Sequence, residues 1–351
     1  MLNIPNIQQA MSVFVAEELS EVLNTKVVIG RINMGLLNRI IIDDVLLDDQ
    51  SGQEMLKVTR LSAKFDIMPF FKGKISISSV QLFGFNINLR KETPDSPPNF
   101  KFVLDAFASK DTVKKENSLD LRINSILIRR GRMSYHVLSE EETPGKFNAK
   151  HIQLQNIIAN ISLKALSKDS LNLGIKRLSL DEKASGFSLK KMSLKLVANN
   201  KQTNIDNFTI ELPETSLKLD TIHLEYDSLK AFDRFTEQVH FSFRTLPSQV
   251  TLKDISPFVP ILSHFKEPVT LDMEVKGTVD QLTCSHLEIT ADDRQFRLRG
   301  DVSLQDLSRP QDAYVYGTLS ELSANTRGVG FLVRNLSPNY NGVPPLLERL
   351  G

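Results

Sequence analysis

The chain repeats one short pattern of side chains ten times along its 351 residues. In each copy, an apolar residue, any residue and a second apolar residue precede two polar residues, and another apolar, any, apolar triplet follows. Alternation with a period of two indicates a strand with one buried face, but the three-residue step across the polar pair would turn the second triplet to the other face. One extra residue in a β-bulge restores the alignment. The repeat therefore predicts long, kinked strands with one continuous apolar face.

The polar pair is the position at which each kink is expected. These pairs are Asp43-Asp44, Thr59-Arg60, Ser78-Ser79, Asn124-Ser125, Gln155-Asn156, Lys176-Arg177, Lys190-Lys191, Asp220-Thr221 and Ser285-His286, with a weaker copy at Asp206-Asn207. From Phe187 onward the pairs recur about every 15 residues. That interval fits an antiparallel meander in which strands of roughly eleven residues are joined by short turns.

Composition excludes several classes of function. The 43 basic and 42 acidic residues give a net charge of +1 without runs of like charge, so nucleic acid is not expected as a partner. Cys284 is the only cysteine and occupies an apolar position of the repeat, which predicts a small core residue and excludes disulfides within one chain. The apolar runs are far shorter than the roughly 20 residues of a membrane span, and these residues contain no signal peptide.

Helices are expected only at a few positions. Residues Asn6 to Asn24 predict an amphipathic helix, with an apolar stripe of Ile7, Met11, Phe14, Val15, Leu19 and Val22 opposite Gln8, Gln9, Glu17 and Glu21. The predicted organisation is this helix in residues 1–25, a first β-groove segment in 26–253 with helical interruptions near 66–72 and 99–108, and a second groove repeat in 254–351. Because Pro260 to Phe265 matches Pro345 to Leu350 just before the end, we expect the second repeat to be truncated.

Motifs for catalysis are absent from the sequence. The histidines at 136, 151, 223, 240, 264 and 286 form no H-x-x-x-H pair, and the sequence has neither a Walker A loop nor a G-x-S-x-G elbow. Asp43-Asp44, Asp48-Asp49 and Asp292-Asp293 lack the glycine-containing loop of a calcium site and are interpreted as bulge and turn residues. The sequence leaves open whether two residues that are distant along the chain come together in the fold as an acid-base pair. We predict that the chain is not an enzyme and has no cofactor and no metal ligands.

Periodicity alone leaves the purpose of the apolar face open. Such a face closes on itself in a sandwich or barrel, which is the commoner solution, or it remains available to a ligand. The expected helices are few and short beside about fifteen strands. A concave sheet lined by Ile, Leu, Val and Phe suits acyl chains.

The order of several degenerate motifs resembles the AsmA-like superfamily, particularly TamB-type translocation and assembly module proteins. The motifs are a helix after Ile4-Pro5, a strand containing Val28 to Ile32, the run Ile40 to Asp49 with Gly52, Phe70 to Ile75 leading to Val80 and Ile87 to Arg90, and Pro260 to Leu271 with Gly277, Val279 and Leu282. They cover about the first hundred and the last hundred residues. The middle of the chain resembles the family only in its strand pattern.

This resemblance implies an elongated, curved, U-shaped antiparallel β-groove, mainly β and taco-like, similar to bridge-like lipid-transfer proteins. It implies a periplasmic location, with phospholipid acyl chains in the groove and a tether to the inner membrane through a transmembrane helix that these residues lack. The C-terminal domain that would face the outer membrane is also lacking. An outer-membrane assembly protein is a further implied partner.

Two functional hypotheses follow, and a purely structural β-solenoid is a third alternative. The first is a lipid conduit between the inner and outer membranes, and the second is an assembly scaffold or chaperone that binds an outer-membrane protein at a free strand edge. The residues predicted to line the lipid groove are Ile75, Ile77, Val80, Leu82, Leu121, Ile123, Ile126, Ile128, Leu173, Ile175, Leu178, Leu180, Leu189, Met192, Leu219 and Ile222.

Overall fold

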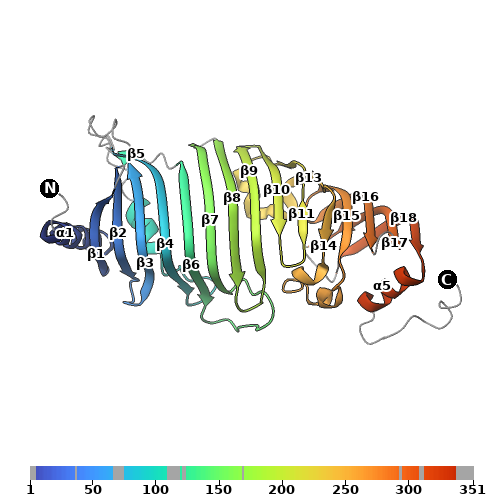
Figure 1. Cartoon of the computed structure of the whole chain (residues 1–351), viewed down its shortest axis with the longest axis horizontal. Helices are drawn as coiled ribbons and strands as arrows, with labels where there is room; N and C mark the ends of the chain where they lie inside the picture. The colour runs from blue at the N-terminus through green and yellow to red at the C-terminus, as the bar shows by residue number, and fades with distance from the viewer. Residues whose placement is uncertain are drawn as a thin grey trace. The chain divides into compact units, whose positions relative to one another are not determined.

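A computed structural model describes residues 5–35, 38–65, 75–108, 119–120, 124–167, 170–291, 295–307 and 312–336. The fold is mainly β with long strands and a few short helices, which confirms the predicted class (Figure 1). Contacts divide the chain into two compact units, Met1–Leu163 with Arg177–Phe187 and Lys164–Lys176 with Ser188–Gly351. The predicted boundary after residue 253 separates two sequence repeats and not two units defined by contacts, and this division into repeats stays a prediction.

The first unit begins with helix α1 (Pro5–Leu23) and is built on one sheet. Its first four strands pair antiparallel in chain order: β1 (Val27–Gly35), β2 (Arg39–Asp48), β3 (Glu54–Phe65) and β4 (Ile75–Lys91). After them come α3 (Lys101–Ala108), β5 (Leu119–Asp120), β6 (Ser125–Val137) and β7 (His151–Ser167). The helix α3 agrees with the interruption predicted near 99–108, whereas the one near 66–72 lies outside the described residues.

Two strand pairs depart from the predicted antiparallel order, because β5 and β6 both run parallel to β4. Ile126 of β6 lies opposite Val80 and Ile128 lies opposite Leu82, and β7 then returns antiparallel to β6. The long connection that contains α3 allows this, because a crossover rather than a tight hairpin joins parallel strands.

The second unit continues with strands of three to twelve residues. These are β9 (Ser188–Asn199), β10 (Gln202–Glu211), β11 (Ser216–Lys218), β12 (Ile222–Glu225), β13 (His240–Arg244), β14 (Ser248–Val250), β15 (Val269–Gly277), β16 (Gln281–Ala291), β17 (Phe296–Gln305) and β18 (Tyr314–Ala324), while β8 (Ser170–Glu182) contributes to both units. The helical segments are η2 (Leu229–Arg234), α4 (Phe235–Gln238), η3 (Leu252–Ile255), η4 (Pro260–His264) and α5 (Thr326–Leu336). The pairings between described strands of this unit are antiparallel.

Kinks occur at several of the predicted polar pairs. Asp44, Asn156, Asn207 and His286, each the second residue of a pair, have φ between 53° and 57°. The strand register shifts across Asn207 and across His286, as a bulge requires. At Asp220-Thr221 the chain breaks into two strands, β11 and β12, which both pair with β10. The prediction that polar pairs mark kinks is confirmed at these positions.

In β4 and β6 the left-handed residue lies at a different position from the predicted polar pair. In β6 the left-handed residue is Arg130 (φ 56°), and the predicted pair Asn124-Ser125 lies at the start of the strand. In β4 the corresponding residue is Gly84 (φ 65°), although the register also shifts near Ser78. The kinks in β4 and β6 align because these strands are neighbours in parallel register. No left-handed residue occurs at Lys176-Arg177 or Lys190-Lys191 in the described strands β8 and β9, so the predicted kink is not confirmed at these two pairs.

The kinks keep the apolar residues of the first unit on one face, as the repeat predicted. The register places four rows side by side across β1, β2, β3, β4, β6 and β7. The rows are Val27, Leu47, Leu56, Ile87, Met133, Leu154; Ile29, Val45, Val58, Phe85, Gly131, Ile157; Ile32, Ile42, Leu61, Leu82, Ile128, Ala159; and Met34, Ile40, Ala63, Val80, Ile126, Ile161. We call this surface the apolar face.

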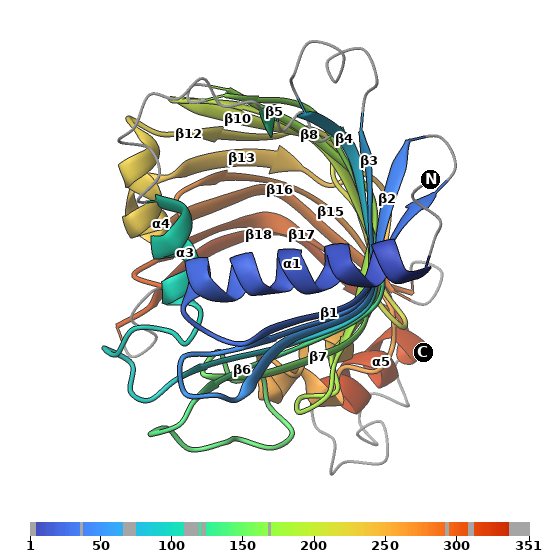
Figure 2. The same ribbon diagram turned by 90° about the vertical axis from the view of Figure 1, so that its left-hand side faces the viewer.

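The predicted N-terminal helix is present and packs against β1 at one end of the apolar face (Figure 2). The cluster contains Val15, Ala16, Leu19 and Leu23 of α1, Val27, Ile29 and Ile32 of β1, and Phe102, Val103 and Ala106 of α3. Phe14 and Val22 belonged to the predicted stripe but are 62% and 41% exposed. Val15 and Leu19 of the predicted stripe pack as expected, whereas Leu23 is buried in place of Val22, and Phe14 and Val22 face solvent. Among the described residues, no helix has the length and apolar character to cross a membrane.

Candidate functional site: the apolar face

The structure describes the side chains of twelve of the sixteen predicted groove residues. Leu121 and Ile123, and the side chains of Ile75 and Ile77 in β4, lie outside the described part. Half-buried are Val80, Leu82, Ile126, Ile128, Leu173, Ile175, Leu178, Leu180, Met192 and Ile222. Leu189 and Leu219 are buried. Most of the described set therefore keeps part of its surface exposed.

In the described part of the chain, strand residues form the centre of the apolar face. Val58, Phe85 and Ile157 are buried there. Packed around them are Val45, Leu56, Leu61, Leu82, Ile87, Ile128, Met133, Leu154 and Leu180, which come from β2, β3, β4, β6, β7 and β8. None of the described side chains of α1 and α3 belongs to this cluster. Within the described part of the chain, the helices therefore cover the β1 end of the face, and beyond it the strand side chains cover one another.

In the second unit, the apolar rows of the C-terminal strands are partly closed by α5. Phe331 of this helix packs on Phe296 and Ala291, with ring centroids of Phe331 and Phe296 5.6 Å apart. Cys284 is buried opposite Val275 and Val302, so its predicted place in the core is confirmed. Burial and the negative charge of Asp301 raise the pKa of the Cys284 thiol, which keeps it protonated and unreactive.

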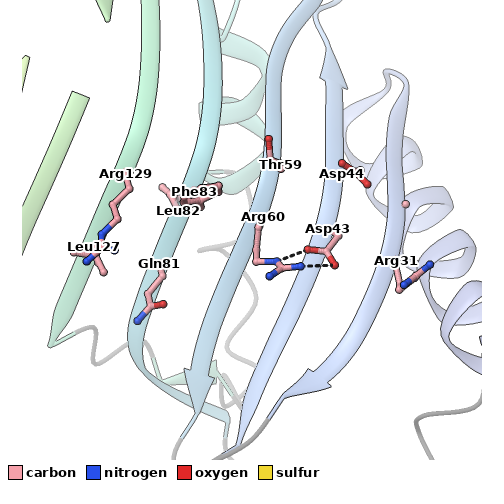
Figure 3. Close-up of a pocket in the computed structure, with 11 residues that line it drawn as sticks. Arg31, Asp43, Asp44, Thr59, Arg60, Gln81, Leu82, Phe83, Leu127 and Arg129 are labelled. Atoms are coloured by element: carbon pink, nitrogen blue, oxygen red, sulfur yellow. Dashed lines mark hydrogen bonds and ion pairs between the residues drawn. The ribbon is translucent and has the colours of Figure 1, made fainter. Parts of the chain in front are cut away.

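A pocket of about 920 Å³ lies across the middle of β1, β2, β3, β4 and β6, where charged side chains gather (Figure 3). Arg60 pairs with Asp43 at 2.6 Å, and the hydrogen bond and charge of Asp43 raise the pKa of Arg60. Arg130 stacks over Phe83 at 5.1 Å. The lining residues are Gly30, Arg31, Asp43, Asp44, Thr59, Arg60, Gln81, Leu82, Phe83, Leu127 and Arg129. They include neither a histidine nor a cysteine, and we assign this pocket no chemistry.

Two buried carboxylates organise turns of the first unit. Asp49, at the end of β2, accepts hydrogen bonds from the backbone N–H groups of Ser51 (2.9 Å) and Gln53 (3.1 Å), which confirms its interpretation as a turn residue. Glu182 likewise accepts from the N–H groups of Gln153 (2.9 Å) and Ser185 (2.7 Å). Burial alone would raise the pKa of each carboxyl group, but the hydrogen bonds outweigh burial and hold both pKa values below their ordinary range.

One cluster was missed from the sequence. His136 of β6 and His151 of β7 are directly opposite each other, with their Nδ1 atoms 3.0 Å apart. A carboxylate oxygen of Glu142, in the loop between these strands, lies 3.9 Å from Nδ1 of His136. The histidines are 15 residues apart in sequence, so no spacing motif reveals them. Only the β6 to β7 register brings them together.

Fold and site define a class: a protein whose bent sheets carry rows of apolar side chains on one face. No protein-family model matches the chain, and no curated protein matches its sequence. The resemblance to the AsmA-like superfamily therefore stays a prediction.

Proposed function

We propose that the chain is a periplasmic, bridge-like lipid-transfer module that shelters phospholipid acyl chains on its apolar face. The observation that carries the proposal is the central cluster of that face, which is built from strand residues and to which no described helix residue contributes. Residues around its centre, such as Leu82, Ile128 and Met133, are only half-buried. An apolar ligand that covers them gains roughly 25 cal/mol for each Å² removed from water.

The dimensions of the apolar face suit an acyl chain. Each row crosses six strands, and neighbouring strands are about 4.8 Å apart, so a row is about 24 Å long. One leaflet of a bilayer has a hydrocarbon thickness of about 15 Å, which sets the length scale of its acyl chains. A single row is therefore long enough to hold a complete chain. The expected tether to the inner membrane and delivery toward the outer membrane rest on the family resemblance.

Photocrosslinking tests this proposal. A photoreactive residue is placed at Ile126 or Ile128, on the apolar face, and at Leu127 or Arg129, which alternate with them on β6 and line the charged pocket. After incubation with phospholipid vesicles, we expect lipid adducts at 126 and 128 and at least tenfold fewer at 127 and 129, as measured by mass spectrometry. Equal labelling at all four positions, or labelling at none, would contradict the lipid function.

One observation favours the second candidate, an assembly scaffold that binds a strand of an outer-membrane protein. Within the described part of the chain, β18 pairs with β17 and with no other strand, and its residues are exposed on both faces. Tyr314, Tyr316 and Leu322 are each at least 60% exposed. An exposed edge with apolar side chains is suited to β-augmentation. Absence of lipid adducts, together with measured binding of an outer-membrane protein strand, would move the preference to this candidate.

A further inference from the structure

We propose that His136, His151 and Glu142 bind a zinc ion at the end of β6 and β7. One possible ligand atom from each residue lies within 4.8 Å of the other two. Two imidazoles and one carboxylate are a ligand set that Zn²⁺ accepts, with water in a fourth, open position. This site is independent of the proposed lipid function.

The distances fit a tetrahedral ion after small side-chain movements. Zinc bonds to nitrogen and oxygen are about 2.0 to 2.1 Å long, so two ligand atoms of a tetrahedral site lie about 3.3 Å apart. The Nδ1 atoms of His136 and His151 are 3.0 Å apart, and Glu142 Oε1 is 3.9 Å from Nδ1 of His136. The third pair, His151 and Glu142, lies within 4.8 Å. Side-chain rotations that shorten this distance by up to about 1.5 Å bring all three atoms to the required spacing of about 3.3 Å.

The protonation of His151 is already set for metal binding. Its Nε2 lies 2.9 Å from the backbone carbonyl oxygen of Glu140. A carbonyl can only accept, so in a neutral His151 ring Nε2 carries the proton and Nδ1 presents its lone pair toward His136. A histidine that ligates a metal usually donates its other N–H to a carbonyl in this way. Without metal, Nδ1–H of His136 donates to that lone pair; with metal, the His136 proton moves to Nε2, and the ion takes its place between the rings.

Burial places the open coordination position on the solvent side. His151 is 7% exposed, whereas the side chain of Glu142 is 63% exposed. A cavity of about 200 Å³ adjoins both residues and is also lined by Asn148 and Lys183, which leaves room for the water ligand.

Hydrogen bonds hold the loop that carries Glu142. Asn148 donates from its side chain to the carbonyl oxygen of Glu141 at 3.0 Å, and the N–H of Gly145 donates to Ala184 O at 3.0 Å. The carboxylate therefore approaches the two histidines from an ordered loop, and the metal would fasten this loop to β6 and β7.

The test uses the full chain after removal of metals with a chelator. Zinc chloride is titrated by calorimetry, and bound metal is counted by plasma mass spectrometry after desalting. We expect one zinc per chain, at least 100-fold weaker binding for His136→Gln and at least tenfold weaker binding for Glu142→Gln. Cobalt should give the strong visible absorption of a tetrahedral site in the parent protein and lose it in His136→Gln.

His223→Gln is the matched control. His223 lies beside a carboxylate, with Nε2 3.0 Å from Glu225 Oε1, but its other ring nitrogen contacts Asn204 and not a second histidine. Zinc binding should be unchanged in this variant. Less than 0.1 zinc per chain in the parent protein would overturn the proposal and leave a hydrogen-bonded histidine pair. Equal loss in His223→Gln would also overturn it, because the zinc would then be held by scattered surface histidines.

Discussion

Replacing Asp49 by alanine is expected to lower the free energy of unfolding by about 3 to 5 kcal/mol, the range for removing one partner of a buried ion pair. Asp49 is 2% exposed, and its Oδ2 lies 2.7 Å from the guanidinium of Arg90 and 3.1 Å from the side-chain amide of Asn99. Its Oδ1 accepts from the backbone of Ser51 and Gln53. The alanine variant therefore leaves one largely buried cation and several donors without their acceptor. Urea unfolding followed by circular dichroism measures the loss.

Two further variants separate the carboxylate's hydrogen bonds from a general effect of charge. Asp95→Ala removes an exposed carboxylate from the loop after β4 and should change stability by less than about 0.5 kcal/mol. Asp49→Asn keeps the shape but turns one acceptor into a donor, so it should lie between Asp95→Ala and Asp49→Ala. A loss below about 1 kcal/mol for Asp49→Ala would show that the turn does not depend on this network.

The depressed pKa values of Asp49 and Glu182 also set the sign of a pH effect. A carboxyl group whose pKa is lower in the folded state stabilises the fold above its unfolded pKa, about 4, and loses that contribution as pH falls through the folded pKa. We therefore expect the free energy of unfolding to decline below about pH 4. The decline should be smaller in Asp49→Asn, because that variant lacks one of the two groups. Unfolding curves between pH 2.5 and 7 measure both effects.

The repeat predicted the apolar face because a strand's side chains alternate regardless of its partners. The kinks at Asp44, Asn156 and Asn207 were predictable, since a polar pair between apolar triplets leaves few other solutions. The kink in β6 was missed because Gly131 occupies an apolar position of the repeat without an apolar side chain. Only the neighbouring strand reveals its role, since the ring of Phe85 fills the space beside it.

Pairing between strands accounts for the remaining differences. Alternation says nothing of strand direction, so the parallel pair of β4 and β6 was not foreseen. The pair of His136 and His151 was not predicted for the same reason, because it depends on the register of β6 and β7. The charged pocket also depends on register, because Asp43 and Arg60 come from adjacent strands. A single sequence predicts which face of a strand is buried, but it does not predict which residue lies opposite.

Gly131 and Phe85 allow the alignment of the rows to be tested by a double-mutant cycle. A Cβ added at Gly131 would lie 2.4 Å from Phe85 Cζ and 3.0 Å from Ile157 Cβ. Its φ is not in the left-handed region, so the expected cost of Gly131→Ala, about 1 to 3 kcal/mol, comes from crowding and not from backbone strain. Phe85 is 7% exposed at the centre of the apolar face, and Phe85→Ala should cost about 3 to 5 kcal/mol.

The two losses should not add. In the Phe85→Ala background the ring that crowds position 131 is gone, so Gly131→Ala should cost less than about 0.5 kcal/mol there, giving a coupling of about 0.5 to 3 kcal/mol. Ala63→Gly, on the same face but in another row, is the control and should add independently to Phe85→Ala. Additive losses for Gly131 and Phe85 would mean that the two residues do not share space in the folded protein. The parallel register of β4 and β6, and with it the row that joins β1 to β7 across the apolar face, would then be wrong.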